Sequence, residues 1–273
     1  MKVRLKKTWV PIVLLLFVCF IVWIYVTTGV LQNKPIVSQS HGFVWSQYPY
    51  PKIKLTKEQQ SRVYSSAMVH GSLAKSQPKY KVVWVDPSNY GERYPKDIYG
   101  KPVKNKPIIV LHETDASTSS VINFFQTSHQ DESVQASYHT LIQSDGTVVY
   151  LVPPEKRAFG AANSVFDSIK GAETIKTNPH LAPSVNNFAY HISLESPREG
   201  YMNNNPTHRG YTEAQYYSLA WLISQLHVPD ERITTHKLVD RSGQKIDPRS
   251  FDVSKFLDFL HTSPWINTLN KIK

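Results

Sequence analysis

The sequence predicts an α/β fold, in which a single domain with a central mixed β-sheet flanked by helices follows one N-terminal transmembrane helix. Three observations predict the domain. Residues 107–113 form a continuous apolar run of strand length, residues 138–152 alternate in polarity around Asp145-Gly146, and residues 212–228 carry apolar side chains at helical spacing. Strands interleaved with helices and one clear hairpin are typical of a mixed sheet.

The transmembrane helix is predicted at residues 9–31, which contain no charged side chain. A helix of this length would span about 34 Å, enough to cross a hydrocarbon core of about 30 Å. The basic tail at residues 1–8 holds four cations and no acid, whereas Lys34 is the single cation just beyond the helix. This asymmetry predicts a cytoplasmic N-terminus, with everything after residue 31 outside the cytoplasm (periplasmic or extracytoplasmic).

A cleaved signal peptide is the alternative to this signal anchor. Its apolar region would be about 7 to 15 residues long and would be followed by small residues at the cleavage site. Here the apolar run is longer, and residues 25–35, "YVTTGVLQNKP", contain no such site. The sequence therefore favours an uncleaved, single-pass membrane protein.

The remaining elements follow in order along the chain. Residues 32–75 are predicted to be a tether, rich in Pro, Ser and Gln, that ends with a short helix. The folded domain is predicted at 76–265, with a C-terminal tail at 266–273. Within the domain, the predicted strands and helices lie at 80–85, 107–113, 119–126, 138–152, 188–195, 212–228 and 252–261.

Charge and cysteine content exclude several functions. Cys19 is the only cysteine and lies in the predicted membrane helix, so the exported part has no disulfide and no thiol nucleophile. The net charge of +10 falls to about +6 without the basic tail. On an exported domain this modest excess favours anionic cell-surface material as the partner. No aromatic-interleaved basic stretch occurs, so we expect no nucleic-acid binding.

Three side chains stand at the ends of strands or after turns. His112 ends the buried run, His236 follows residues 231–235, and Asp247 comes 11 positions later. Two imidazoles and a carboxylate are suitable zinc ligands and would leave a fourth position for water. On spacing alone, hydrogen-bonded structural histidines remain the alternative. Ala116 stands where an H-E-x-x-H motif needs its second histidine, and no G-x-S-x-G or phosphate-binding motif is present.

The order of five segments resembles the type-2 N-acetylmuramoyl-L-alanine amidases, a family that also includes peptidoglycan-recognition proteins and some phage lysozymes. These segments are "IIVLHET", "SYHTLIQSDGTVVYLVP", "ISLE", "YTEAQYYSLAWLISQL" and "ITTHKLVDRSGQKIDP", and together they cover about residues 110–260. The pattern H…R-x-G-x-K-x-D-P is the most specific part. The resemblance implies a mixed sheet with flanking helices and one zinc ion in a surface groove.

The resemblance also implies roles for individual residues. His112, His236 and Asp247 match the metal ligands, Glu195 matches the acid that takes the proton of water, and Lys245 matches the cation that stabilises the oxyanion. The implied reaction is zinc-dependent hydrolysis of the amide between N-acetylmuramic acid and L-alanine, in peptidoglycan or muropeptides, during cell-wall remodelling or turnover.

Two further positions bear on the substrate. His139 matches a family position near the groove, which implies contact with the substrate, although an ordinary strand histidine is the alternative. Residues 158–163 read "AFGAAN", with Gly160 where the family often has histidine and Phe159 where it has tryptophan. The lost ring keeps a non-catalytic peptidoglycan-binding module open as an alternative function, and a membrane-tethered wall scaffold is a second alternative.

Overall fold

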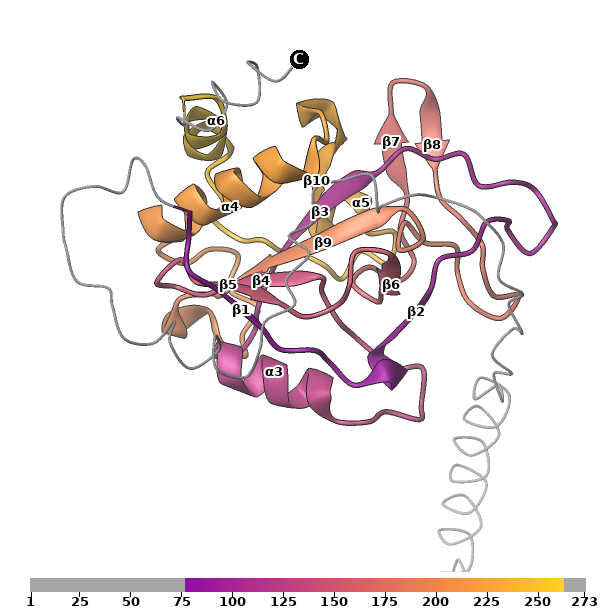
Figure 1. Ribbon diagram of the computed structural model, residues 1–273, viewed down its shortest axis with the longest axis horizontal. Helices are drawn as coiled ribbons and strands as arrows, with labels where there is room; N and C mark the ends of the chain where they lie inside the picture. Colours follow the sequence, from indigo (N-terminus) through magenta and orange to yellow (C-terminus); the bar gives the residue numbers. More distant parts are fainter. Residues whose placement is uncertain (1–76, 263–273) are drawn as a thin grey trace, which may run out of the picture. The chain divides into compact units, whose positions relative to one another are not determined.

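The computed structural model describes residues 77–262 (Figure 1). The predicted membrane helix at 9–31, the tether and the tail at 266–273 lie outside these residues, so their bounds and that of the domain stay predictions. Within 77–262, none of the helices combines the length and the apolar character that crossing a membrane requires.

A six-stranded sheet forms the centre of this part of the chain (Figure 1). Its order is β1 (Tyr80–Val82), β5 (Val148–Tyr150), β4 (Thr140–Ile142), β9 (Ala189–Leu194), β3 (Ile108–Glu113) and β10 (Ile233–Thr235). β4 and β5 pair antiparallel, whereas the other neighbouring strands pair parallel. The prediction of a mixed sheet is therefore confirmed. β3 and β9 are buried throughout, because parallel neighbours and helices cover both their faces.

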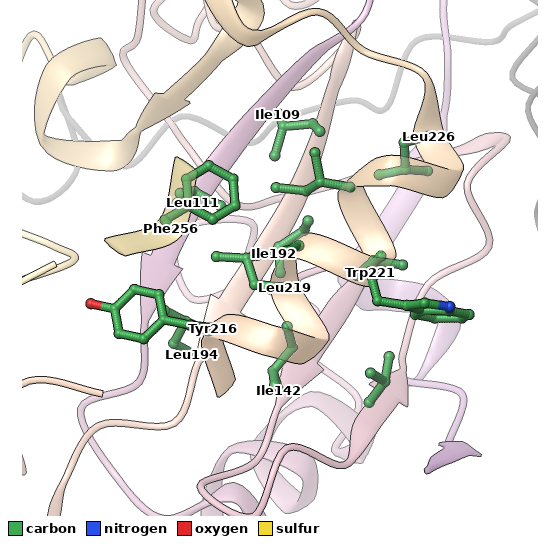
Figure 2. Close-up of a cluster of buried hydrophobic side chains, with 14 of the residues drawn as sticks. Ile109, Leu111, Ile142, Ile192, Leu194, Tyr216, Leu219, Trp221, Leu226 and Phe256 are labelled. Atoms are coloured by element: carbon green, nitrogen blue, oxygen red, sulfur yellow. The ribbon is translucent and has the colours of Figure 1, made fainter. Parts of the chain in front are cut away.

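Helices cover the two faces of the sheet. α4 (Glu213–Leu226) and α6 (Val253–Thr262) lie on one face, and α3 (Thr118–Gln126) lies on the other (Figure 1). Successive side chains of a strand therefore pack against different helices. Ile142 packs in the cluster of buried side chains around α4, whereas its neighbour Leu141 packs with Val121 and Phe125 of α3. Figure 2 shows the α4 cluster, which includes Ile109, Leu111, Ile192, Leu194, Leu219, Trp221 and Phe256.

Local sequence sets the ends of these elements. Thr212 and Gln215 form a complete capping box at the start of α4, and Ser117 caps α3. Between β4 and β5 the chain turns at Gly146, whose φ of +83° suits glycine and whose missing side chain leaves room for the carbonyl of Ala214. The predicted hairpin and the long predicted helix are thus confirmed.

Shorter elements surround the sheet. Two further strand pairs, one turn of α-helix and three 3₁₀ turns complete the described chain: β2 (Tyr90–Glu92) with β6 (Lys156–Ala158), β7 (Phe166–Ser168) with β8 (Gly171–Glu173), α5 (His236–Val239), η2 (Pro87–Asn89), η3 (Arg198–Gly200) and η4 (Asp230–Arg232).

Candidate active site

Parallel pairing of β3 and β10 brings two histidines together at one edge of the sheet. Thr235, the last residue of β10, pairs with Leu111 of β3, so His236 and His112 follow at the same level. Their ring centroids are 4.6 Å apart. The hydroxyl of Thr235 accepts a hydrogen bond from the backbone N–H of Leu238 and thereby caps α5, which turns the chain directly at His236.

Asp247 returns to the same place at the end of a loop. The backbone N–H of Lys237 donates to the carbonyl oxygen of Asp247 over 2.9 Å, which holds the two segments together. The carboxylate of Asp240 accepts backbone N–H bonds from Ser242, Gln244 and Lys245 and so shapes the loop between them.

The three side chains form a compact donor set. The Nδ1 of His236 lies 3.0 Å from Asp247 Oδ1, and the Nδ1 of His112 lies 3.4 Å from Asp247 Oδ2. One ligand atom from each of the three lies within 4.8 Å of the others. Zinc bonds of about 2.0 to 2.1 Å in tetrahedral geometry would place neighbouring ligand atoms roughly 3.3 Å apart. These separations suit a single zinc ion.

Protonation in the cluster also suits a metal. Burial lowers the pKa of His112 to about 4, so its ring is neutral near pH 7. Burial alone would raise the pKa of Asp247, but its contacts with His112 and His236 hold that pKa well below the usual range. The fully buried Nδ1 of His112 makes no hydrogen bond of ordinary length to any described residue. An orphaned buried nitrogen, aimed at a carboxylate and a second imidazole, fits a metal ligand.

A groove of about 550 Å³ opens beside this cluster. His236 and Asp247 contribute to its wall, and Val121 and Phe125 of α3 form an apolar part of the lining. The structure also brings Lys245 there. Its side chain is exposed and lines the groove, and its charge helps to lower the pKa of His112. Four of the predicted site residues therefore lie together.

Glu195 makes different contacts. Its carboxylate accepts the backbone N–H of Thr118 over 2.8 Å and the backbone N–H of Ser144 over 2.9 Å, and it does not line the groove. The residue of β9 that pairs with His112 is Ser193. Glu195 thus joins the N-terminus of α3 to the turn after β4.

His139 belongs to the core. Its ring is fully buried and does not line the groove. The Nδ1 accepts the backbone N–H of His191 over 2.9 Å, so the neutral ring carries its proton on Nε2, 3.2 Å from the carbonyl oxygen of Lys156. Burial and the nearby charge of Arg93 lower its pKa well below the usual value. The ring thereby links the residues before β4 to β9 and β6.

Tyr138, which sequence reasoning passed over, lines the groove. Its ring centroid lies 4.8 Å from that of His112. Burial, together with the charges of Asp247 and Asp115, raises the pKa of its hydroxyl, which therefore stays protonated and able to donate. The signal was available, because residues 138–152 carry a predicted strand pattern, and adjacent side chains of a strand face opposite sides, so only one of Tyr138 and His139 could face the groove.

A second missed group, Glu113, is an anchor for the groove wall. Its carboxylate accepts hydrogen bonds from Arg249, from the Tyr211 hydroxyl over 2.6 Å and from His208 over 2.8 Å. The guanidinium of Arg249 in turn donates to carbonyl oxygens of Gly200, Asn203 and Asn205. This network fixes the loop that carries Asn203 and Asn204 into the groove.

Comparisons with known proteins identify the family of the chain. Residues 102–250, more than half of the chain, match the model of a family described as N-acetylmuramoyl-L-alanine amidase. Among solved structures the chain is similar to a selenomethionine derivative of AmpD (23% identity, 71% of this chain and 99% of that chain, TM-score 0.46). It is also similar to AmpDH3 from Pseudomonas aeruginosa in complex with anhydromuramic pentapeptide (18%, 64% and 65%, 0.42) and to the amidase LysC from Clostridium intestinale URNW (20%, 70% and 97%, 0.37). A search of curated protein sequences found no match.

Proposed function

The chain belongs to the N-acetylmuramoyl-L-alanine amidase family, and we propose that it cleaves the amide between N-acetylmuramic acid and L-alanine with one zinc ion. The observation that carries the zinc proposal is the donor set of His112, His236 and Asp247 beside the groove. Neutral imidazole and ionised carboxylate are the states in which these side chains bind zinc.

When bound, the ion supplies a Lewis acid for the scissile carbonyl and lowers the pKa of water to about 7. The chain's own groups act on the charge that develops on the carbonyl oxygen. Lys245 brings a cation to the groove, and Tyr138 brings a hydroxyl that remains protonated. Both interactions strengthen as the oxygen becomes anionic, so they lower the barrier more than they favour substrate binding.

The proton of the attacking water needs an acceptor that reaches the groove. Glu195 was expected in this role, but both of its oxygens accept backbone N–H groups, and its side chain does not line the groove. Asp115 is an exposed carboxylate that lines the groove, and its charge acts on the Tyr138 hydroxyl. We therefore assign the proton transfer to Asp115, which then passes the proton to the leaving amine of L-alanine.

The position of Glu195 is also the observation that favours the second candidate function, a non-catalytic peptidoglycan-binding module. Such a module would keep the groove and its metal without turnover. The proposed location follows from the sequence. The predicted helix at 9–31 would hold the domain at the outer side of the membrane, which is the side on which the peptidoglycan of the cell wall lies. The alternative of a wall scaffold requires no groove chemistry.

One experiment separates these functions. Full-length protein is incubated with a defined muropeptide, and the products are identified by mass spectrometry. We expect release of the intact stem peptide from the lactyl group, loss of this activity after chelation, and its return with zinc. Binding of the muropeptide without any product, in zinc-loaded protein, would establish the binding module instead. Lys237→Met is a matched control for changes at Lys245, because Lys237 is exposed close by and does not line the groove.

A further inference from the structure

The imidazole of His191 fills the space that a side chain at residue 160 would need. A Cβ atom built on Gly160 would lie 2.5 Å from both Cγ and Nδ1 of His191, closer than such atoms approach in proteins. The φ of Gly160 lies outside the left-handed region, so the backbone does not require glycine there. Glycine at 160 is therefore explained by the close approach of the ring.

This ring lies directly behind a proposed metal ligand. The Nδ1 of His191 is 2.9 Å from the Nε2 of His112, and the side chain of His191 is fully buried. It does not line the groove. The contact to His112 is the one hydrogen bond that the ring makes within residues 77–262, because its Nε2 has no partner there.

The tautomers of this pair follow from chemistry. If His112 binds a metal through Nδ1, its proton must sit on Nε2, and the only acceptor beside that proton among the described residues is the Nδ1 of His191. The proton of the His191 ring then sits on Nε2, where it is buried and unpaired. An apolar side chain would fill the same space without burying two ring nitrogens. The contact with His112 explains why residue 191 is a histidine and not an apolar residue.

The ring of His191 is also held in orientation. It stacks on His139 with ring centroids 5.7 Å apart and an interplanar angle of 7°. His139 is itself fixed, because its Nδ1 accepts the backbone N–H of His191 and its Nε2 faces the carbonyl oxygen of Lys156. The direction of the Nδ1 lone pair toward His112 is therefore set by packing before any metal binds.

We propose that His191 is a positioning residue for the metal site. It accepts a hydrogen bond from the Nε2–H of His112, which fixes the His112 tautomer whose Nδ1 carries no proton, and it orients the His112 ring toward Asp247. This inference rests on the proposed zinc site. Partners of this kind behind a metal-binding histidine typically contribute 10- to 100-fold to metal affinity. Gly160 serves the same end, since it provides the space for the ring.

Two substitutions of nearly equal size test the proposal in the full-length protein. In His191→Asn the Oδ1 atom stands close to the position of Nδ1 and can accept the same proton, whereas in His191→Leu a methyl group replaces it. Zinc affinity is measured by competition with a chromophoric chelator, and thermal unfolding is measured without metal. We expect the leucine variant to bind zinc about 10- to 100-fold more weakly and the asparagine variant to stay close to wild type. Gly160→Ala, which must displace the ring, should lose affinity as the leucine variant does.

The outcomes distinguish this inference from the proposed function. Absence of zinc binding in the wild type would overturn the zinc site and the inference together. Tight binding by wild type and leucine variant alike would overturn the inference alone, as would equal weakening in both variants with a matching loss of metal-free stability. If the leucine variant does not fold, nitrogen-15 spectra of the zinc-loaded wild type decide: His112 should carry its proton on Nε2, and a metal-bound Nε2 would refute the proposal.

Discussion

Replacement of Glu195 by glutamine is expected to weaken the fold and to leave turnover largely intact. The carboxylate joins two separate segments, because one oxygen accepts the N–H of Thr118 at the start of α3 and the other accepts the N–H of Ser144. Glutamine keeps one acceptor oxygen, but its amide group must face the second N–H with donors of its own. One bond to a charged acceptor is lost, and the negative charge near the start of α3 disappears.

The magnitude follows from these contacts. A hydrogen bond to a charged group contributes about 1.5 to 3 kcal/mol, and the exposure of the Ser144 contact favours the lower end of that range. For a domain of this size each kcal/mol corresponds to roughly 2 to 4 °C in Tm. We therefore expect Glu195→Gln to lower Tm by about 3 to 8 °C. If Glu195 instead took the proton of water, turnover would fall by about 10² to 10⁴.

The assay pairs thermal unfolding with steady-state kinetics on a soluble muropeptide at a temperature well below both transitions. Asp115→Asn is the matched comparison, since it also removes one carboxylate charge but lies in the groove. We expect Asp115→Asn to lose turnover and to keep its Tm. Loss of turnover in Glu195→Gln at unchanged Tm and zinc content would refute this reasoning and restore Glu195 as the base.

Four further results are expected. Lys245→Met should lower kcat by about 10² to 10³ with little change in KM, while Lys237→Met should not; a rise in KM at constant kcat would assign Lys245 to substrate binding. Asp247→Asn should reduce zinc content in elemental analysis, and full occupancy in that variant would show that the carboxylate is no ligand. The metal-free protein should lose stability as pH falls from about 6.5 toward 4. The buried imidazoles have lower pKa values in the folded protein than in the unfolded chain, so the unfolded chain binds more protons in this pH range. A flat Tm between pH 7 and pH 5 would contradict this expectation. Protease added to spheroplasts should remove the domain and leave a protected stub that contains residues 9–31, whereas a soluble product beginning near residue 30 would indicate a cleaved signal peptide.

Strand patterns predicted most of the sheet and part of the site. His112 and His236 stand at the ends of strands, and parallel strands bring such ends to one edge, so their meeting could be expected from the sequence. The direction of Glu195 could not. β9 ends at Leu194, one residue earlier, so the alternation of side chains along the strand no longer determines where the carboxylate points.

The pairing of His191 with Gly160 shows a different limit of sequence reasoning. Sequence inspection found a missing ring at residue 160 and could only record a loss. The ring beside Gly160 comes from a strand 31 positions later, and its presence depends on how closely the two segments approach. The hydrophobic periodicity of a sequence carries no information on the distance between two segments. Similarly, the family resemblance assigned His139 to the groove, but His139 is buried in the core and its neighbour Tyr138 lines the groove.

The position of β10 at the edge of the sheet links chain completion to metal capture. β10 covers the outer side of β3, whose residues Ile108–Glu113 are buried and mostly apolar. A chain cut short before β10 would lack both His236 and Asp247 and would leave this apolar strand as an open edge, which is a template for aggregation. Incomplete copies should therefore be insoluble rather than soluble and merely inactive. Zinc uptake during synthesis would report that the last strand has docked.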